Sequence, residues 1–363
     1  MITSAPHTTA PRDARRAIRA SLVIVNYNGG EKLRRCLSSV VRSVTADDEV
    51  IVVDNASTDG SAAKTAEAFS HITLVQAPAN AGFGAGGNLG AIRSHGEHLV
   101  FLNPDTEVAA GWLEALLAPF ADKPDVGLVT AKILLADPPD RINACGNVVH
   151  LTGLTLCRGL GAPRAAFDQD EEVPAISGAA FAIRRAVFEA LGGFDADFFL
   201  YMEDTDLSWR ARLAGWRCWY TPHSVVRHEY ALRFTPRKVF YQERNRYATL
   251  LKALRWPTLL ALLPALLIAE IVTWGFVLWG DRANWQNKLD AYRWIMAHWS
   301  SIAQKRAATQ ALRKVRDRDL LQHMGFHLDF GQVGQGRLPR LAQMVFDPLF
   351  FLLRGLALLL VWW

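Results

Sequence analysis

Three acids, Glu203, Asp204 and Asp206, form the densest group of side chains that could carry out chemistry, in the string FFLYMEDTDLSWRARLAGW. They open a segment whose apolar residues recur at helical spacing, and acids at a helix N-terminus are favoured by the helix dipole whatever the function. The aromatic, largely apolar run before them could also shield and tune a general base. The string therefore fits either simple helix capping or an acid–base site.

A second candidate group follows an apolar strand in LNPDTEV, which contains Asn103 and Asp105. A carboxylate there could hold Mg²⁺ or Mn²⁺ against a diphosphate, because hard cations take oxygen ligands and neutralise a phosphate leaving group. Asn-Pro-Asp is also a common turn sequence. His228, which follows a short strand, is either an ordinary surface histidine or a further metal ligand.

The string VVDNASTDGS places Asp54 at the end of another apolar strand. A carboxylate there can accept a hydrogen bond from the imide N–H of uracil or thymine, a donor that adenine lacks. Asx-rich turns after strands are common in α/β proteins of every function. The motif alone leaves nucleotide recognition and a structural turn equally open.

The glycine-rich string NAGFGAGGNLG contains Gly82, Gly84 and Gly87 in the G-x-G-x-x-G spacing of dinucleotide-binding folds. That fingerprint belongs on the first strand-to-helix turn, whereas here it follows the third strand. We interpret it as a loop whose backbone approaches a nucleotide, with an ordinary exposed glycine loop as the alternative.

The elements that must position these groups begin with four short apolar runs, SLVIVN, EVIVVD, HITLVQ and HLVFLN, separated by helical patterns. Buried strands alternating with helices predict an α/β fold with a parallel sheet. Ligands of such sheets collect at the carboxyl ends of the strands. Those ends carry Asn26, Asp54 and residues 76–87 and 103–105, so we expect these polar residues to face one crevice.

The domain organisation predicted from composition has three parts. Residues 1–20 lack the apolar stretch of a secretory signal and are expected to be a disordered arm. Residues 21–230 form the α/β domain, with a nucleotide half at about 21–108 and an acceptor half at about 109–230. Residues 231–363 are expected to be helical and membrane-associating, with hydrophobic segments at 257–279 and 341–363.

The segment 257–279 contains a single acid, Glu270, and is long enough to cross a bilayer. A single crossing would place the basic loop that follows outside, against the positive-inside tendency. Open alternatives are a helix in the interface, a re-entrant hairpin, a pair of crossings with 341–363, or a core or dimerisation element of a soluble protein. Asp347 and Arg354 make 341–363 a poor span, whereas the Trp residues and flanking basic residues suit an interfacial anchor.

The charge distribution points to an anionic surface as partner. Of the 40 basic residues, 16 lie in the stretches 233–255 and 282–318. We expect a membrane surface rather than nucleic acid, and a homodimer is possible. The four cysteines show no C-x-x-C spacing, which argues against a zinc site and a disulfide framework.

Taken in order, VIVNYNG, VVDNASTDGS, NAGFGAGGNLG, LNPDT, SGAAFAIRR, the GGFD…FFLYMEDTDL string and a final RH resemble family 2 glycosyltransferases of the rhamnosyltransferase-like group. The resemblance runs from about residue 21 to 230. It implies a GT-A fold, a nucleoside-diphosphate sugar donor linked to dTDP or UDP, a divalent cation (Mg²⁺ or Mn²⁺) and inversion at the anomeric carbon.

Residue by residue, the resemblance matches Asp54 to base recognition, Asp105 and His228 to the metal, and Asp204 to the catalytic base. Gly178 matches the acceptor-side loop. Asn103 departs from the general D-x-D pattern, which puts metal dependence in doubt. The remaining expected site residues are Asn26, Asn28, Asn80, Gly82, Asn88 and Asn103 for the nucleotide sugar, and Glu203 and Arg244 for the acceptor.

The resemblance thus implies transfer of a sugar, best guessed as L-rhamnose from dTDP-rhamnose, to a glycan acceptor carried on polyprenyl diphosphate in bacterial cell-surface polysaccharide synthesis. The expected place is the cytoplasmic face of the inner membrane, held peripherally or monotopically. Two other classes stay open. Asn103 suggests a catalytically silent sugar-nucleotide-binding protein, and the Gly82 loop suggests an NAD-dependent oxidoreductase.

Overall fold

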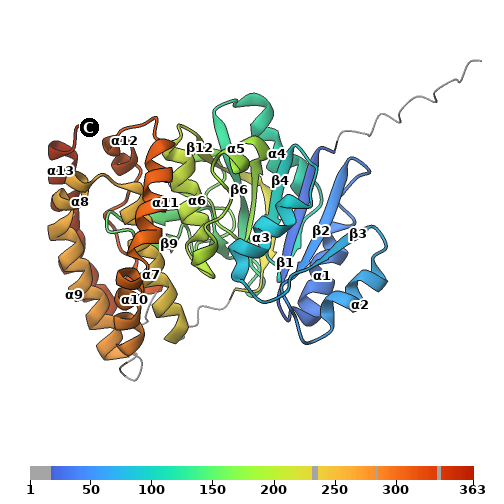
Figure 1. Cartoon of the computed structure of the whole chain (residues 1–363), viewed down its shortest axis with the longest axis horizontal. Coiled ribbons are helices and arrows are strands. Elements are labelled where there is room, and N and C mark those ends of the chain that lie inside the picture. Colours follow the sequence, from blue (N-terminus) through green and yellow to red (C-terminus); the bar gives the residue numbers. More distant parts are fainter. Residues whose placement is uncertain (1–17, 231–235, 281, 283–284, 333–336) are drawn as a thin grey trace, which may run out of the picture.

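A mixed sheet forms the centre of the computed structural model, which describes residues 18–230, 236–280, 282, 285–332 and 337–363 (Figure 1). Its strands run in the order β10-β12-β6-β11-β4-β1-β2-β3, with β5 beside β12 and β7 beside β6, and β8 and β9 form a separate hairpin. The strands are β1 (Ala20–Asn26), β2 (Asp48–Asp54), β3 (Ile72–Gln76), β4 (His98–Leu102), β5 (Thr106–Val108), β6 (Val126–Leu135), β7 (Ile142–Ala144), β8 (Asn147–Val149), β9 (Thr155–Cys157), β10 (Glu171–Glu172), β11 (Ala180–Arg184) and β12 (Arg217–His228).

The helices cover both faces of this sheet and then form a region of their own. They are α1 (Gly30–Val40), α2 (Ser61–Ala68), α3 (Gly82–Ile92), α4 (Trp112–Asp122), α5 (Arg185–Ala190), the 3₁₀ turn η1 (Ala196–Phe198), α6 (Glu203–Leu213), α7 (Pro236–Ala253), α8 (Trp256–Ala261), α9 (Leu263–Gly280), α10 (Trp285–Ala297), α11 (Trp299–Ala311), α12 (Asp317–Gln322), η3 (Phe330–Gln332) and α13 (Arg337–Leu360).

The four predicted strands are confirmed as a parallel set, because β1 pairs in parallel with β2 and β4, and β2 pairs in parallel with β3. Successive side chains of β1 point to opposite faces. Leu22 and Ile24 join the core beneath α1 and α4, whereas Val23 and Val25 join the core beneath α3, α5 and α6. Burial on both faces explains why these strands are continuous apolar runs.

The sheet begins earlier than the predicted disordered arm allows. Residues 1–17 lie outside the described residues, but the backbones of Ile18 and Arg19 pair with the sheet and Ala20 begins β1. Arg19 also donates two hydrogen bonds, of 3.0 and 2.9 Å, to Asp48. The ordered chain therefore starts inside the segment 1–20.

The C-terminal helices gather at the end of the molecule away from β3 (Figure 1). Their shared core includes Leu250 of α7, Ala269 of α9 and Phe350 of α13, together with Trp209 and Leu213 of α6. The predicted helical region is therefore packed directly against the helix that opens with the three acids.

The hydrophobic segments differ from the sequence-based expectation in two ways. Segment 257–279 is divided at Leu262 into α8 and α9, since Pro264 lacks the N–H that would continue the helix. Among the described residues, one helix is long and apolar enough to cross a membrane by length and composition, Leu341–Leu360, with a mean hydropathy of 1.6 and 11% of it buried. Its two charged side chains have partners, because Asp347 hydrogen bonds to His327 and Arg354 donates to the carbonyl of Met324.

Candidate active site

A cavity of about 1230 Å³ lies where the sheet domain meets the C-terminal helices. Of the residues predicted for the site, its lining includes Asn103, Asp105, Gly178, Glu203, Asp204 and His228. Strand β4 delivers the first two, β12 delivers His228, and α6 delivers the two acids. The sheet and one helix thus bring together groups that are more than 120 residues apart in the chain.

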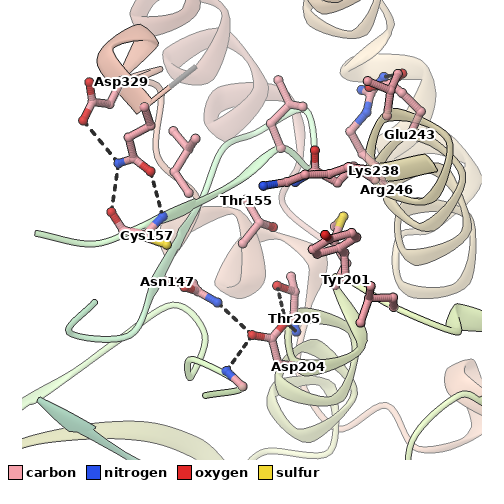
Figure 2. Close-up of a pocket in the computed structure, with 18 of the residues that line it drawn as sticks. Asn147, Thr155, Cys157, Tyr201, Asp204, Thr205, Lys238, Glu243, Arg246 and Asp329 are labelled. Carbon is pink, nitrogen blue, oxygen red and sulfur yellow. Dashed lines mark hydrogen bonds and ion pairs between the residues drawn. The ribbon is translucent and has the colours of Figure 1, made fainter. Parts of the chain in front are cut away.

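Asp204 is held in one orientation by hydrogen bonds from three neighbours (Figure 2). Its Oδ2 accepts from the backbone N–H of Gly178 at 2.8 Å and from Nδ2 of Asn147 at 3.0 Å, and its Oδ1 accepts from the N–H of Thr205 at 2.7 Å. A Cβ on Gly178 would lie 3.2 Å from Oδ2, so a glycine suits this close approach. Burial raises the pKa of Asp204, and the hydrogen bonds act against that rise.

Glu203 lies beside Asp204 but in a different environment. It is buried, and its Oε2 has no hydrogen-bond partner among the described residues. Burial and the neighbouring charge of Asp204 raise the pKa of Glu203 to about 8. The two adjacent acids therefore differ in their surroundings: hydrogen bonds to Asp204 favour its carboxylate and oppose the effect of burial, whereas Oε2 of Glu203 receives none.

The loop before α6 is strained, and α7 holds it. Phe199, Tyr201 and Met202 have φ of 29°, 68° and 64°, conformations that cost non-glycine residues energy. Nδ2 of Asn245 in α7 donates to three carbonyls of this loop. Their residues and distances are Phe198 at 3.2 Å, Leu200 at 3.0 Å and Tyr201 at 2.7 Å. The helical region thus fixes the loop from which the acids project.

Asp105 and His228 face each other at the ends of β4 and β12. The distance from His228 Nε2 to Asp105 Oδ1 is 3.2 Å, and that to Asn103 Nδ2 is 3.5 Å. His228 Nδ1 lies 2.8 Å from Oδ1 of Asn143. A neutral ring that donates from Nδ1 to this oxygen would present the lone pair of Nε2 toward Asp105.

A lone pair facing a carboxylate fits a site for a cation, and a partner on the second ring nitrogen is typical of metal-bound histidine. Within the described part of the chain, no group of three or more His, Cys, Asp or Glu side chains converges on one point. The protein itself can therefore supply Asp105 and His228 as metal ligands, with the Asn103 amide next to them.

Of the predicted nucleotide-binding residues, Asn26, Asn28 and Asp54 lie at the ends of β1 and β2, outside the cavity lining. Asp54 Oδ1 accepts from Asn26 Nδ2 at 3.4 Å and from the N–H of Ser57 at 3.2 Å. Asn28 Oδ1 accepts from the N–H of Thr58 at 2.8 Å. These contacts form one polar edge at the carboxyl ends of β1 and β2, where the sequence pattern predicts it.

The glycine-rich string forms helix α3 from Gly82 onward rather than the predicted loop, and the start of this helix contacts both that edge and the loop before α6. Asn55 donates to Asn80 Oδ1 at 3.0 Å and to the carbonyl of Gly82 at 3.1 Å. A Cβ on Gly82 would lie 1.9 Å from the carbonyl oxygen of Phe199, so only glycine fits there. Asn88 exchanges two hydrogen bonds with the backbone of Phe194 and therefore joins two structural elements rather than facing the cavity.

Arg244 does not line the cavity. Its guanidinium is buried, donates to the carbonyl of Asp197 at 2.6 Å and lies 4.5 Å from the ring centroid of Trp294. Three residues that hold the site in place were not predicted from the sequence: Asn143, Asn147 and Asn245. The first two stand in the short string INACGN, where two asparagines flank a glycine turn, and Asn245 gives no signal because its partners are about 45 residues away.

A family model described as "Glycosyl transferase family 2" matches residues 21–192. Among curated proteins, the chain is 29% identical over 234 residues to an "N-acetylglucosaminyl-diphospho-decaprenol L-rhamnosyltransferase" of Mycobacterium tuberculosis, covering 58% of this chain and 76% of that protein. It is 31% identical over 229 residues to a "Pre-mycofactocin glycosyltransferase" of the same species, covering 61% of this chain and 45% of that protein.

Solved structures show the same fold at low sequence identity. S. aureus TarS 1-349 in complex with UDP-GlcNAc gives a TM-score of 0.53 at 17% identity, covering 94% of this chain and 89% of that chain. The mannosyltransferase PcManGT from Pyrobaculum calidifontis, in complex with GDP-Man and Mn²⁺, gives a TM-score of 0.50 at 18% identity, covering 98% and 90%. The predicted GT-A fold is confirmed by these neighbours.

Proposed function

We propose that the chain is a glycosyltransferase of family 2 that transfers L-rhamnose from dTDP-rhamnose to a glycan acceptor carried on polyprenyl diphosphate, with inversion. The observation that carries this proposal is Asp204, a partly buried carboxylate fixed by hydrogen bonds from three neighbours in a large cavity. The name of the mycobacterial relative, which specifies an L-rhamnosyltransferase and a decaprenol-linked acceptor, supports the choice of sugar and acceptor.

In the proposed reaction, Asp204 accepts the proton of an acceptor hydroxyl. The hydroxyl oxygen forms a bond to the anomeric carbon while the bond from that carbon to the diphosphate oxygen breaks, and its electron pair leaves with the nucleoside diphosphate. Attack opposite the leaving group inverts the anomeric centre. The raised pKa of Asp204 suits this task, because a base works best when its pKa lies closer to the working pH.

Asp105 and His228, with the Asn103 amide beside them, are the residues that would hold a divalent cation. When bound, Mg²⁺ or Mn²⁺ would neutralise the charge that develops on the departing diphosphate. The Asn143 amide oxygen would accept the proton of His228 Nδ1 and so leave Nε2 available for the cation.

The polar edge at the ends of β1 and β2 would bind the nucleotide. Asp54 would accept the imide N–H of thymine or uracil, with Asn26 and Ser57 keeping its carboxylate in place. Asn28, Asn80 and Gly82 would flank the same nucleotide.

A lipid-carried acceptor requires the active site to lie near a bilayer, and the outer faces of α9 and α13 suit this. Exposed side chains there include Leu267, Ile271, Leu352 and Leu359, with 57%, 67%, 65% and 79% exposed. We propose monotopic or peripheral association with the cytoplasmic face of the inner membrane, in support of cell-surface polysaccharide synthesis.

The experiment measures release of free nucleoside diphosphate from dTDP-rhamnose, UDP-sugars and GDP-sugars in the presence of Mg²⁺ or Mn²⁺ and a bacterial lipid extract. We expect release from dTDP-rhamnose that depends on the lipid. Binding of a sugar nucleotide without any release would instead favour a silent binding protein, and the mechanism above would have to be withdrawn.

A further inference from the structure

The cavity that contains Asp204 continues into a second part, which we call the apolar arm, between the β8–β9 hairpin and helices α9 and α13. Its lining is mainly hydrocarbon and includes Leu154, Leu156, Ile271, Val272, Phe276 and Phe346. These residues come from outside the sheet, and the proposed transfer of a sugar does not account for them.

The polar side chain of Gln332 at this arm is already engaged. The Gln332 side chain accepts from the N–H of Cys157 at 3.1 Å and donates to its carbonyl at 2.9 Å, and it also donates to Asp329 at 3.2 Å (Figure 2). A glycan in this arm would find few free hydrogen-bonding groups, whereas an apolar chain would lose water without needing any.

The basic residues of the lining differ in what they contact. Lys32 pairs with Glu229 at 3.0 Å, and Arg246 and Lys288 both pair with Glu243, at 2.8 and 2.9 Å. The ammonium group of Lys238, near the start of α7, lies 5.3 Å from the ring centroid of Tyr201. Tyr201 is three residues from Asp204, so Lys238 lies on the boundary between the catalytic part of the cavity and the apolar arm (Figure 2).

The apolar arm is continuous with the exposed apolar surface. Ile271 belongs to the lining and is 67% exposed, and α13, which contributes Phe346, contains the helix long and apolar enough to cross a membrane. An elongated apolar molecule could therefore extend from the arm directly into a lipid environment without passing through water.

We propose that the apolar arm binds the first isoprenoid units of the acceptor's lipid chain and that Lys238 contacts the diphosphate joining this chain to the glycan. The glycan would then extend toward Asp204. This inference rests on the proposed function for the direction of the acceptor, but binding of an isoprenoid diphosphate can be measured without any sugar transfer.

Two glycines provide a matched pair of variants. Gly275 of α9 lines the cavity and Gly355 of α13 does not; both are exposed helical positions where an added Cβ would meet no atom within 4 Å. Gly275→Trp should fill the arm, and Gly355→Trp adds the same side chain elsewhere on the apolar surface. Neither change is expected to disturb folding.

The experiment measures the affinity of the full chain, in detergent micelles of fixed composition, for geranylgeranyl diphosphate, geranylgeraniol and inorganic diphosphate. We expect Gly275→Trp to weaken binding of both lipids by about tenfold or more, a change equivalent to about 1.4 kcal/mol. Gly355→Trp should leave both affinities within about twofold. Lys238→Gln should weaken binding of geranylgeranyl diphosphate and leave the affinity for geranylgeraniol unchanged.

Equal effects of the two tryptophan variants would overturn the inference, since they would show partition into the general apolar surface. So would a wild-type chain that binds neither lipid. Release of nucleoside diphosphate serves to separate the two proposals. If transfer to a lipid acceptor is unaffected by Gly275→Trp, the proposed function stands and the apolar arm is not the lipid site.

Discussion

The two parts of the cavity are built in different ways. The catalytic part has polar side chains, several of them fixed by directed hydrogen bonds, as the contacts of Asp204 with Gly178 and Asn147 show. The apolar arm is lined by flexible hydrocarbon side chains from helices whose outer faces are exposed. Proton transfer depends on sub-ångström geometry, whereas burial of a lipid chain is non-directional. The difference indicates that changes in the catalytic part should reduce the rate, and changes in the apolar arm should reduce affinity for the acceptor.

The largest effect is expected at Asp204. Asp204→Asn removes the base while keeping shape, so turnover should fall by about 10²–10⁴-fold, and donor binding should be retained because Asp54 lies outside this cavity. Steady-state turnover and donor titration measure the two quantities. Asp122→Asn, at an exposed acid at the end of α4, is the control. An Asp204→Asn variant with normal turnover would rule out the assignment.

Asn143 tests whether the cation site is supported as described. Asn143→Ala removes the acceptor that orients His228, so the metal concentration for half-maximal activity should rise by about 10–100-fold. Turnover at saturating metal should largely recover. Wild-type activity that persists in excess chelator would remove the cation from this account.

Asn245 tests the contact between the helical region and the catalytic loop. Asn245→Ala leaves three loop carbonyls without their donor, at a cost of about 1–3 kcal/mol, and we expect kcat to drop by about tenfold. Because Asn245 touches neither substrate in this scheme, donor affinity should stay unchanged. A variant that loses stability in a thermal melt yet keeps its kcat would show that the contact is only structural.

The exposed face of α13 should control association with membranes. Replacing Leu352 and Leu359 with Gln removes side chains whose burial is worth about 1.5–3 kcal/mol each, so the fraction bound to anionic vesicles in a flotation assay should fall several-fold. Ile92→Gln, at a residue of α3 that is 77% exposed, is the matched control. Equal losses for both variants would count against a membrane-facing α13.

The smallest effect, on stability alone, is expected at Glu203. Its pKa of about 8 in the folded chain lies above its ordinary value of 4.5, so the folded chain holds a proton that the unfolded chain has released between these values. The contribution of Glu203 to the free energy of unfolding is therefore lost as the pH rises from about 4.5 to 8. Glu203→Gln removes this dependence, and its Tm relative to wild type should increase between pH 5 and pH 8. A constant Tm difference would contradict the raised pKa.

Much of the sheet and part of the site could be predicted from the sequence, because they depend on local patterns. Apolar runs fix the parallel strands, and polar residues at their ends must meet at one edge. Asp105 and His228 lie in the cavity for this reason, and Asp204 joins them from the start of α6. Their roles as base and metal ligands stay predictions.

The rest depends on contacts between distant segments, which composition does not reveal. The basic stretches suggested an anionic partner, yet Arg246, Lys252 and Lys288 are buried in ion pairs with acids of this chain. Glu270, the single acid of 257–279, accepts from Arg246 at 2.6 Å. The sequence alone does not distinguish basic residues that form ion pairs inside the protein from basic residues on its surface. That distinction requires the three-dimensional arrangement of the helices.

The most direct test of the central claim is the anomeric configuration of the product, determined by NMR after transfer from dTDP-rhamnose to a polyprenyl-diphosphate-linked acceptor. A single displacement assisted by Asp204 predicts a product whose anomeric configuration is opposite to that of the donor, and no product from Asp204→Asn. A product that retains the donor's configuration would contradict the direct displacement and the role of Asp204 as its base.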